Sequence, residues 1–449
     1  MLRDLSLSQR IRLLAPILAL TIGMLGFATE PSATRPDLIL VSIDTLRPDH
    51  LGCYGYPRDT SPEIDRLAET AVRFETAIAQ APSTLPSHAS ILSSMLPSQH
   101  GALYSRNQGL ADEIFTVTEA LRDAGYRTSA FTGGGQMAPE FNLNQGFEVY
   151  LSEHGTLPEK VEHAIEWLKK LPSNEPAFIF LHTYDVHHAY EPDAKTMARF
   201  DSGYEGKLPD RIEVDLLKRI NGHRGMEPLE IDAADLQHII NAYDAEIAEM
   251  DVGIGELIDK LKRIGRYQNT VVIITSDHGE EFGEHGRVGW HSHNLYDHQL
   301  KVPLILRLPN DKYAGTVVRP QVRGIDLAPT LLELAGVEAP PSFQGQSLLL
   351  RLGPDADTEH WLARSERDGK KDPLDVSLRD GRFKWYKGRL FDLQEDPLEQ
   401  HDRSDLHPEV AARLDTELKK KIPPMITSAR ELMLEKETRR RLKELGYAD

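Results

Sequence analysis

Thr270-Val-Val-Ile-Ile-Thr-Ser-Asp-His-Gly279 decides the fold of this chain and the place of its site. The residues to Ser276 form a short apolar run that is typical of a buried β-strand, and Asp277 and His278 follow at its carboxyl end. A second run, Leu38–Ile43, is followed by Asp44. Because open parallel sheets bind ligands at the carboxyl ends of their strands, the two runs predict a site at one edge of an α/β sheet.

Asp44, Asp277 and His278 are candidate ligands of a divalent cation, since carboxylates and imidazoles bind hard or borderline ions. Each residue also has a plainer interpretation, because a strand-end aspartate often caps a helix and Asp-His-Gly can be simple turn chemistry. Three such residues at one sheet edge favour the metal. Calcium, magnesium, manganese and zinc all remain candidates, and a second ion could lie near Asp185 and its neighbouring histidines.

The net charge of the chain limits the classes of partner that it can bind. The chain has 449 residues and a formal charge of −18, which argues against nucleic acid because phosphate backbones need clustered cations. An anionic substrate stays compatible with this charge, since a metal ion reverses the potential locally. The single cysteine, Cys53, allows no intrachain disulfide.

The N-terminal segment indicates export. Three arginines precede the apolar stretch Leu13–Ala28, which is short for a membrane span and fits the apolar region of a signal peptide. We therefore expect residues 1–28 to be a signal peptide or a short anchor and residues 29–35 to be a linker. The predicted location is periplasmic or extracellular, and no other stretch is long and apolar enough to cross a bilayer.

Strand and helix patterns alternate after the linker. They predict an α/β fold, a doubly wound and mostly parallel sheet flanked by helices, over residues 36–347. From about residue 348 the strands look shorter and antiparallel, so residues 348–449 are expected to form a smaller C-terminal α+β subdomain with a terminal helix. The polar stretch 193–226 is expected to be an irregular lid or substrate loop.

A hydroxyl nucleophile is expected in Thr84-Leu-Pro-Ser-His88, directly before an apolar helical stretch. There the Thr84 hydroxyl could meet both a helix N-terminus and a metal ion, which stabilise an alkoxide and a bound anion. The alternative is that Thr84 or Ser87 only caps the helix. His187 and His291 are candidates for leaving-group protonation, oxyanion contacts or a second metal.

Several motifs in order along the chain together carry a family resemblance. They are Val41–Gly55, Thr84–His88, Gly125–Thr128, Thr275–Gly279, Leu295–Asp297 with Val302-Pro303, Asp326–Thr330 and Phe391–Pro397. With these motifs the chain resembles the sulfatase family of the alkaline phosphatase superfamily. The resemblance implies hydrolysis of a sulfate or phosphate ester of a small molecule, glycan or lipid through a covalent intermediate.

The resemblance also implies residue roles. Asp44, Asp277 and His278 match family metal ligands, and Thr84 matches the nucleophile position. His187 matches a histidine that faces the leaving group, while His291, Asn107 and His88 occupy positions near the substrate anion, His88 where the family has arginine. Arg47 is a further candidate for stabilising developing charge.

Thr84 stands where sulfatases usually carry the cysteine or serine that becomes formylglycine. Threonine cannot yield that aldehyde, so formylglycine is not expected here. A threonine nucleophile resembles the phosphodiesterases and the phosphoglycerol or phosphoethanolamine transferases of the superfamily. A transferase and a non-catalytic binding protein of the same fold are therefore the alternatives to a sulfuric or phosphoric ester hydrolase.

Overall fold

β1 (Asp37–Ile43) and β7 (Thr270–Thr275) are neighbouring parallel strands inside the main sheet. The structure, a computed structural model, describes residues 35–201, 203–367, 374–420, 422 and 430–447. The signal peptide or anchor and residues 29–34 of the linker therefore lie outside the described residues. Within the described part, no helix combines the length and the apolar character needed to cross a bilayer.

The described helices and strands follow one another along the chain as predicted, in α/β order. The helices are α2 (Pro62–Glu69), α3 (Thr84–Ser93), α4 (Pro97–His100), α5 (Val117–Asp123), α6 (Leu157–Lys169), α7 (Ala194–Phe200), α8 (Val214–Ile220), α9 (Ala233–Arg263), α10 (Asp297–Leu300), α11 (Leu327–Leu334), α12 (Pro408–Leu418) and α13 (Lys436–Glu444). The other strands are β2 (Val72–Ile78), β3 (Gln108–Gly109), β4 (Arg127–Thr132), β5 (Val149–Ser152), β6 (Ala177–Thr183), β8 (Glu281–Phe282), β9 (Val288–Trp290), β10 (Lys301–Arg307), β11 (Val317–Val318), β12 (Val322–Arg323), β13 (Ala363–Arg367), β14 (Asp375–Arg379), β15 (Phe383–Tyr386), β16 (Arg389–Asp392) and β17 (Arg430–Glu431).

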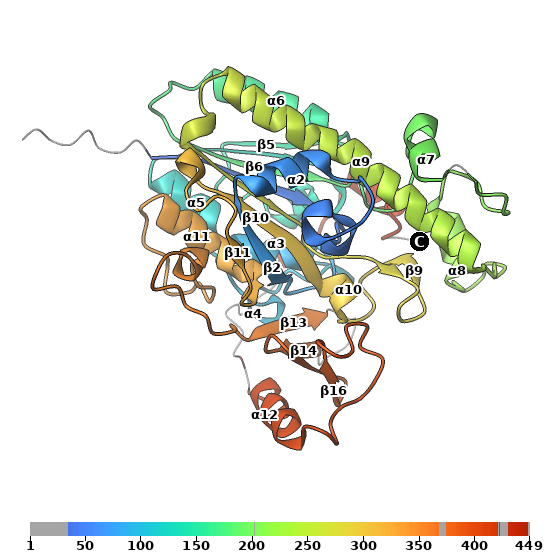
Figure 1. Cartoon of the computed structure of the whole chain (residues 1–449). Coiled ribbons are helices and arrows are strands. Elements are labelled where there is room, and N and C mark those ends of the chain that lie inside the picture. Colours follow the sequence, from blue (N-terminus) through green and yellow to red (C-terminus); the bar gives the residue numbers. More distant parts are fainter. Residues whose placement is uncertain (1–34, 202, 368–373, 421, 423–429, 448–449) are drawn as a thin grey trace, which may run out of the picture. The chain divides into compact units, whose positions relative to one another are not determined.

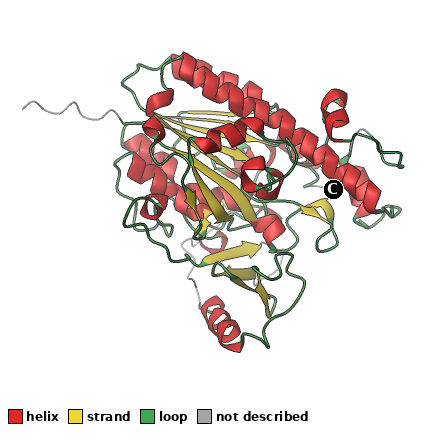
Figure 2. Cartoon of the chain, in the orientation of Figure 1, coloured by secondary structure: helices red, strands yellow, loops and turns green. Residues whose placement is uncertain are grey.

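The main sheet is mostly parallel (Figure 2). Its strand order is β11-β2-β10-β7-β1-β6-β4-β5, with β12 also pairing with β2. β1 pairs in parallel with both β6 and β7, whereas β10 runs antiparallel to β7 and β2. This arrangement confirms the predicted fold class, and it brings the carboxyl ends of β1, β6 and β7 to one edge.

Alternate residues of the central strands enter two separate cores. Leu38 and Leu40 of β1 pack with α3, α5 and α11 on one face, and Ile39 and Val41 pack with α2, α6 and α9 on the other (Figure 1). A fully buried leucine or isoleucine stabilises a fold by about 1.5–3 kcal/mol. Burial on both faces explains why these strands are continuous apolar runs in the sequence.

The C-terminal part contains a second sheet, which is antiparallel, as predicted, with the order β13-β14-β15-β16. α12 packs on this sheet through Leu414, which joins Leu378 and Leu390 in a small core. The chain then returns to the main fold, because β17 pairs with β3 and α13 contacts the short 3₁₀ helix at Gly135–Met137.

The stretch 193–226 is not irregular throughout, in contrast to the prediction. It contains α7 and α8, which each bury one apolar side chain, Met197 and Leu217. The Asp193 carboxylate caps α7 by accepting from the backbone N–H groups of Lys195 and Thr196. A local cap and one buried anchor can stabilise a helix within a polar sequence, and polarity alone hides this signal.

Candidate active site

The strand ends of β1 and β7 bring three predicted ligands together. Asp44, Asp277 and His278 are completely buried. The His278 Nε2 atom lies 3.7 Å from Asp44 Oδ1 and 3.4 Å from Asp277 Oδ2. Their ligand atoms fall within 4.8 Å of one another, a spacing that a single cation can bridge.

The atoms of this group that could bind a metal make no hydrogen bonds, although His88 Nδ1 lies 3.5 Å from Asp277 Oδ2. Asp44 Oδ1, Asp277 Oδ2 and His278 Nε2 are buried without a hydrogen bond, although buried polar atoms are normally satisfied. The other ring nitrogen, His278 Nδ1, lies 2.9 Å from the Gly279 carbonyl oxygen, an outer contact of the kind that orients metal-binding histidines. Burial, and then the charge of Asp277, raise the pKa of Asp44 well above its ordinary value. A divalent cation fits this set of oxygen and nitrogen donors and would relieve the repulsion between the carboxylates.

Thr84 is the first residue of α3, and its hydroxyl enters the same group. Thr84 Oγ1 donates to Asp44 Oδ2 over 3.1 Å. The side chain is completely buried, and the N-cap residue of α3 is Ser83, which makes no capping hydrogen bond. Ser87 Oγ instead donates to the Asp277 carbonyl oxygen. Neither hydroxyl therefore acts as the helix cap, and of the two Thr84 is the one that contacts the carboxylate of a predicted ligand.

His187 and His291 face Thr84 across the Tyr447 hydroxyl. Both point Nε2 at the Tyr447 hydroxyl, over 3.0 Å and 3.2 Å, and that hydroxyl lies 2.8 Å from Thr84 Oγ1. Burial, and then the nearby His188 and His291, lower the pKa of His187 well below its ordinary value; burial lowers that of His291 to about 4. Both imidazoles are therefore neutral at pH 7 in this arrangement.

The Glu280 carboxylate contacts the Nδ1 atoms of two histidines, His291 and His188. Its Oε1 atom lies 3.0 Å from His291 Nδ1 and 3.4 Å from His188 Nδ1. Burial would raise the pKa of this carboxyl, but the hydrogen bonds and charges of the two histidines outweigh burial and hold it well below its usual value. A fixed carboxylate on Nδ1 orients each ring with Nε2 toward the site.

The remaining predicted residues occupy three different places. His88 is buried behind Thr84, with Nε2 2.9 Å from Ser42 Oγ and Nδ1 2.9 Å from the Thr84 carbonyl oxygen. Asn107 lies at the entrance, where Nδ2 donates to the Leu432 carbonyl oxygen. Arg47 forms ion pairs with Asp49 and Glu284, so these carboxylates already engage its guanidinium.

Two cavities open beside the histidines. The first, here called the Asp185 cavity, has a volume of about 730 Å³ and is lined by His187 and His188 among others. The second, the Trp290 cavity, has a volume of about 550 Å³ and is lined by His188, His291 and Asn107. Sites for small ligands are concave and contain a few placed polar groups, as both cavities do.

Comparison with known proteins agrees with this geometry. The family model described as "Sulfatase" matches residues 36–337, more than half of the chain. The chain belongs to the sulfatase family. It is 25% identical over 421 residues to N-acetylglucosamine-6-O-sulfatase of Bacteroides thetaiotaomicron, and the match covers 75% of this chain and 74% of that protein.

Solved structures of similar fold include sulfatase-family neighbours and phosphonate hydrolases. One, determined in complex with its substrate D-glucosamine-2-N,6-O-disulfate, has a TM-score of 0.72 and 20% identity, and the match covers 86% of this chain and 97% of that one. The phosphonate monoester hydrolase of Agrobacterium radiobacter has a TM-score of 0.68 and 21% identity, with coverage of 86% and 94%. These comparisons confirm the predicted sulfatase resemblance and ester-hydrolase class.

Sequence reasoning missed several residues of this sulfatase site. His182 Nε2 lies 3.4 Å from Asp44 Oδ2. It is the penultimate residue of β6, so its place near a strand end could have found it. Glu280, next to the Asp-His-Gly motif, could have been found by its position. Tyr447 carries no motif and lies far along the chain from every other site residue.

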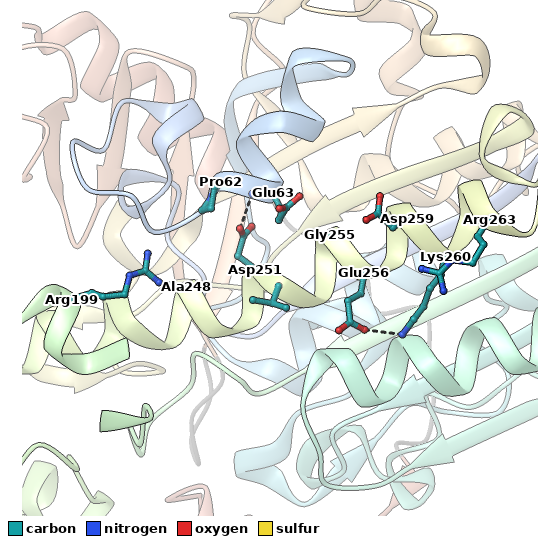
Figure 3. Close-up of a pocket in the computed structure, with 11 residues that line it drawn as sticks. Pro62, Glu63, Arg199, Ala248, Asp251, Gly255, Glu256, Asp259, Lys260 and Arg263 are labelled. Carbon is teal, nitrogen blue, oxygen red and sulfur yellow. Dashed lines mark hydrogen bonds and ion pairs between the residues drawn. The ribbon is translucent and has the colours of Figure 1, made fainter. Parts of the chain in front are cut away.

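A third cavity of the sulfatase lies away from these residues, between α2 and α9 (Figure 3). Its volume is about 510 Å³. The Asp251 carboxylate accepts from the backbone N–H groups of Glu63 and Ile64, and Lys260 pairs with Glu256. The Asp251 hydrogen bonds join α9 to α2, whereas the Lys260–Glu256 pair lies within α9.

Proposed function

We propose that this chain hydrolyses sulfate or phosphate esters through a covalent intermediate on Thr84, with a divalent cation held by Asp44, Asp277 and His278. The observation that carries the proposal is the Thr84 hydroxyl, 3.1 Å from Asp44 Oδ2, beside three buried atoms that could bind a metal and that make no hydrogen bonds. A binding protein that had lost catalysis would have no need to retain this costly arrangement.

The first half of the reaction transfers the acid group to Thr84. A divalent cation bound by the three ligands would lower the pKa of the Thr84 hydroxyl and neutralise charge on the substrate oxygens. Thr84 Oγ1 forms a bond to sulfur or phosphorus while the bond to the leaving oxygen breaks. In the free protein the hydroxyl hydrogen is directed at Asp44 Oδ2, which offers the departing proton a nearby acceptor.

His187 and His291 act on the opposite side of the transferred group. Their Nε2 atoms both face the space above Thr84, and an Nε2 that takes up a proton from solvent when the substrate anion is bound can pass that proton to the leaving oxygen. In the second half, water attacks the Thr84 ester and an Nε2 atom accepts its proton. Thr84 is then regenerated and the inorganic acid is released. Glu280 keeps His291 in the necessary orientation.

The substrate we propose is an ester of a small molecule or a glycan. The named activity of the Bacteroides relative and the sugar bound in the solved neighbour support a glycan, whereas the phosphonate hydrolases support a phosphorus acid. His187, His188 and His291 could hold a second ion, which would favour phosphorus because a phosphoryl group carries more charge. Asp185 is not part of that group, and its Oδ2 accepts from the Leu157 N–H. Export of the chain remains a prediction.

The test is to trap and map the covalent intermediate. The wild type is incubated with aryl sulfate, phosphate monoester and phosphate diester panels and each divalent metal, then quenched and digested for mass spectrometry. We expect an adduct of sulfate or phosphate mass on Thr84. T84A should bind metal nearly normally and form no adduct, while the matched controls S83A and S87A should still form it.

Two results would contradict the proposal. An adduct mapped to Ser83 or Ser87 would assign the nucleophile to another hydroxyl, and full turnover by D277A would remove the metal site from the reaction. Acceptor alcohols added to the same assay test the transferase alternative. A transferase would form the ester of the acceptor in preference to the free inorganic acid.

A further inference from the structure

The Tyr447 hydroxyl occupies the position that a substrate must take. It lies 2.8 Å from Thr84 Oγ1, 3.0 Å from His187 Nε2 and 3.2 Å from His291 Nε2. A sulfur or phosphorus atom attacked by Thr84 must lie about 3–3.5 Å from its oxygen, with the leaving oxygen toward the histidines. A phenol hydroxyl that contacts all three groups leaves no room for that atom.

The end of α13 directs Tyr447 into this position. The N–H of Tyr447 donates to the Leu442 carbonyl and the N–H of Gly446 to the Lys443 carbonyl, the two bonds of a Schellman motif. Gly446 has φ +81°, and a Cβ added there would lie 3.2 Å from His188 Nε2 and 3.3 Å from Val214 Cγ1. Both the turn and the close approach therefore favour glycine, and the backbone passes directly over His188.

Three residues at the end of α13, Leu445, Gly446 and Tyr447, separate the two cavities that lie beside the histidines. Leu445 lines both the Asp185 cavity and the Trp290 cavity, as does His188, and Gly446 and Tyr447 line the Trp290 cavity. If this segment moved away, the two cavities would join over His187, His188 and His291. The opened space would suit an ester larger than either cavity receives alone.

The segment that carries Tyr447 is docked by few apolar contacts. Leu432, Leu442 and Leu445 are buried, β17 adds a two-residue pairing with β3, and Thr438 donates to Glu140. Most of the other side chains of α13 are charged and half-buried or exposed. Elements with few buried contacts open at low free-energy cost, so this segment can leave by breaking the short β17–β3 pairing, without unfolding the main sheet or the sheet β13–β16.

We propose that residues 430–447 form an internal gate, in which Tyr447 occupies the ester position and a substrate anion binds by displacing it. The proposal rests on the function proposed above for Thr84, and it adds how access to that site is regulated. With the gate closed, the apparent affinity for an anion is reduced by the fraction of molecules that are open.

Anion affinity tests the gate without turnover. Binding of inorganic phosphate, and separately of inorganic sulfate, to the metal-loaded protein is measured by calorimetry for the wild type, Y447A and G446A. We expect both variants to bind at least one of the anions about tenfold or more tightly than the wild type, because the competing occupant is removed or misplaced. The remote variant Y313F should match the wild type. Unchanged or weaker binding of both anions by Y447A would overturn the gate.

Hydrogen exchange gives a second readout on the unaltered chain. With a saturating anion, the amides of Leu442–Tyr447 should exchange faster, because the segment has left the site. Slower exchange would show that Tyr447 closes over the ligand, and would also overturn the gate. The two proposals can fail separately. If the wild type forms the Thr84 adduct but Y447A binds anions with unchanged affinity, only the gate is refuted. If Y447A binds anions more tightly but no hydroxyl carries an adduct, only the role of Thr84 as nucleophile is refuted.

Discussion

At the scale of single residues, the site contains two buried carboxylates whose charges repel each other, and a bound cation would reduce that repulsion. Asp44 and Asp277 are both fully buried, with Asp44 Oδ1 and Asp277 Oδ2 lacking hydrogen-bond partners. Two neighbouring buried carboxylates destabilise each other unless a counter-charge or a proton is present. The same pair that we propose binds the ion therefore weakens the metal-free fold.

This conflict predicts opposite effects of one substitution with and without metal. In a chelator, D277N should unfold at a higher temperature than the wild type, a gain of about 1 kcal/mol, because one buried charge is gone. Saturating metal at about 100 times its Kd should stabilise the wild type by about 2.7 kcal/mol and D277N by much less. Thermal unfolding with and without metal measures both effects.

The control for this residue is Asp355, which is exposed. D355N should follow the wild type in both conditions. Equal stabilisation of D277N and the wild type by metal would show that the ion binds elsewhere.

At the scale of elements, the contact between α2 and α9 depends on Asp251. Its carboxylate caps the first turn of α2, over 2.7 Å to the Glu63 N–H and 2.9 Å to the Ile64 N–H (Figure 3). Burial nevertheless raises the pKa of Asp251 to about 7, because the backbone bonds only partly offset the loss of water. The protonation state of this one group therefore affects how two helices pack.

The sign of the resulting pH dependence follows from that shift. Between pH 4 and 7 the folded chain holds the Asp251 proton that the unfolded chain has lost. The stability contributed by this group is therefore greatest at low pH and falls as pH rises to about 7. We expect the unfolding free energy of the wild type minus that of D251N to fall by about 1–3 kcal/mol between pH 5 and pH 8.

Urea unfolding at the two pH values measures this difference. Asp259 lines the same cavity but is exposed, so D259N should show little pH-dependent difference from the wild type. A difference between the wild type and D251N that does not change with pH would mean that the capping bonds keep the carboxylate ionised.

At the scale of the whole described fold, a buried ionic cluster joins the small C-terminal sheet to the main one. Lys384 of β15 is fully buried, with Nζ 2.9 Å from Asp297 Oδ1 and 3.0 Å from Glu399 Oε1. Arg379 of β14 also pairs with Asp297, which begins α10. The charges come from segments far apart in the sequence, so they order the two sheets relative to each other.

Removal of the lysine should leave the buried Glu399 carboxyl without its counter-charge and Asp297 with only the Arg379 guanidinium. K384M should therefore lower the unfolding free energy by about 3–5 kcal/mol, measured by urea unfolding. Lys387, on the exposed turn after the same strand, provides the matched control, and K387M should change stability by less than about 0.5 kcal/mol. Similar losses for both variants would assign the effect to general loss of charge rather than to the cluster.

Local features of the sequence determined much of the fold and the centre of the site. Apolar runs bounded by polar residues marked β1 and β7 closely, since burial on both faces leaves a signal in each strand itself. Asp44, Asp277 and His278 were predicted as ligands because they follow the ends of strands, and Thr84 was predicted as the nucleophile because it stands at the start of a helix. α7 and α8 were missed, because their few buried anchors leave almost no periodic pattern.

The sequence by itself determined which residues stand at strand ends and helix starts, because chain neighbours decide these positions. Only the tertiary structure decided that His88 lies behind Thr84, that Glu280 contacts two histidines, and that Tyr447 reaches the Thr84 hydroxyl. Thr84 and Tyr447 are hydrogen-bonded across 363 positions of the chain, and such a contact depends on how whole elements pack. A residue placed by long-range packing leaves no mark in its local pattern, so the gate became visible only in three dimensions.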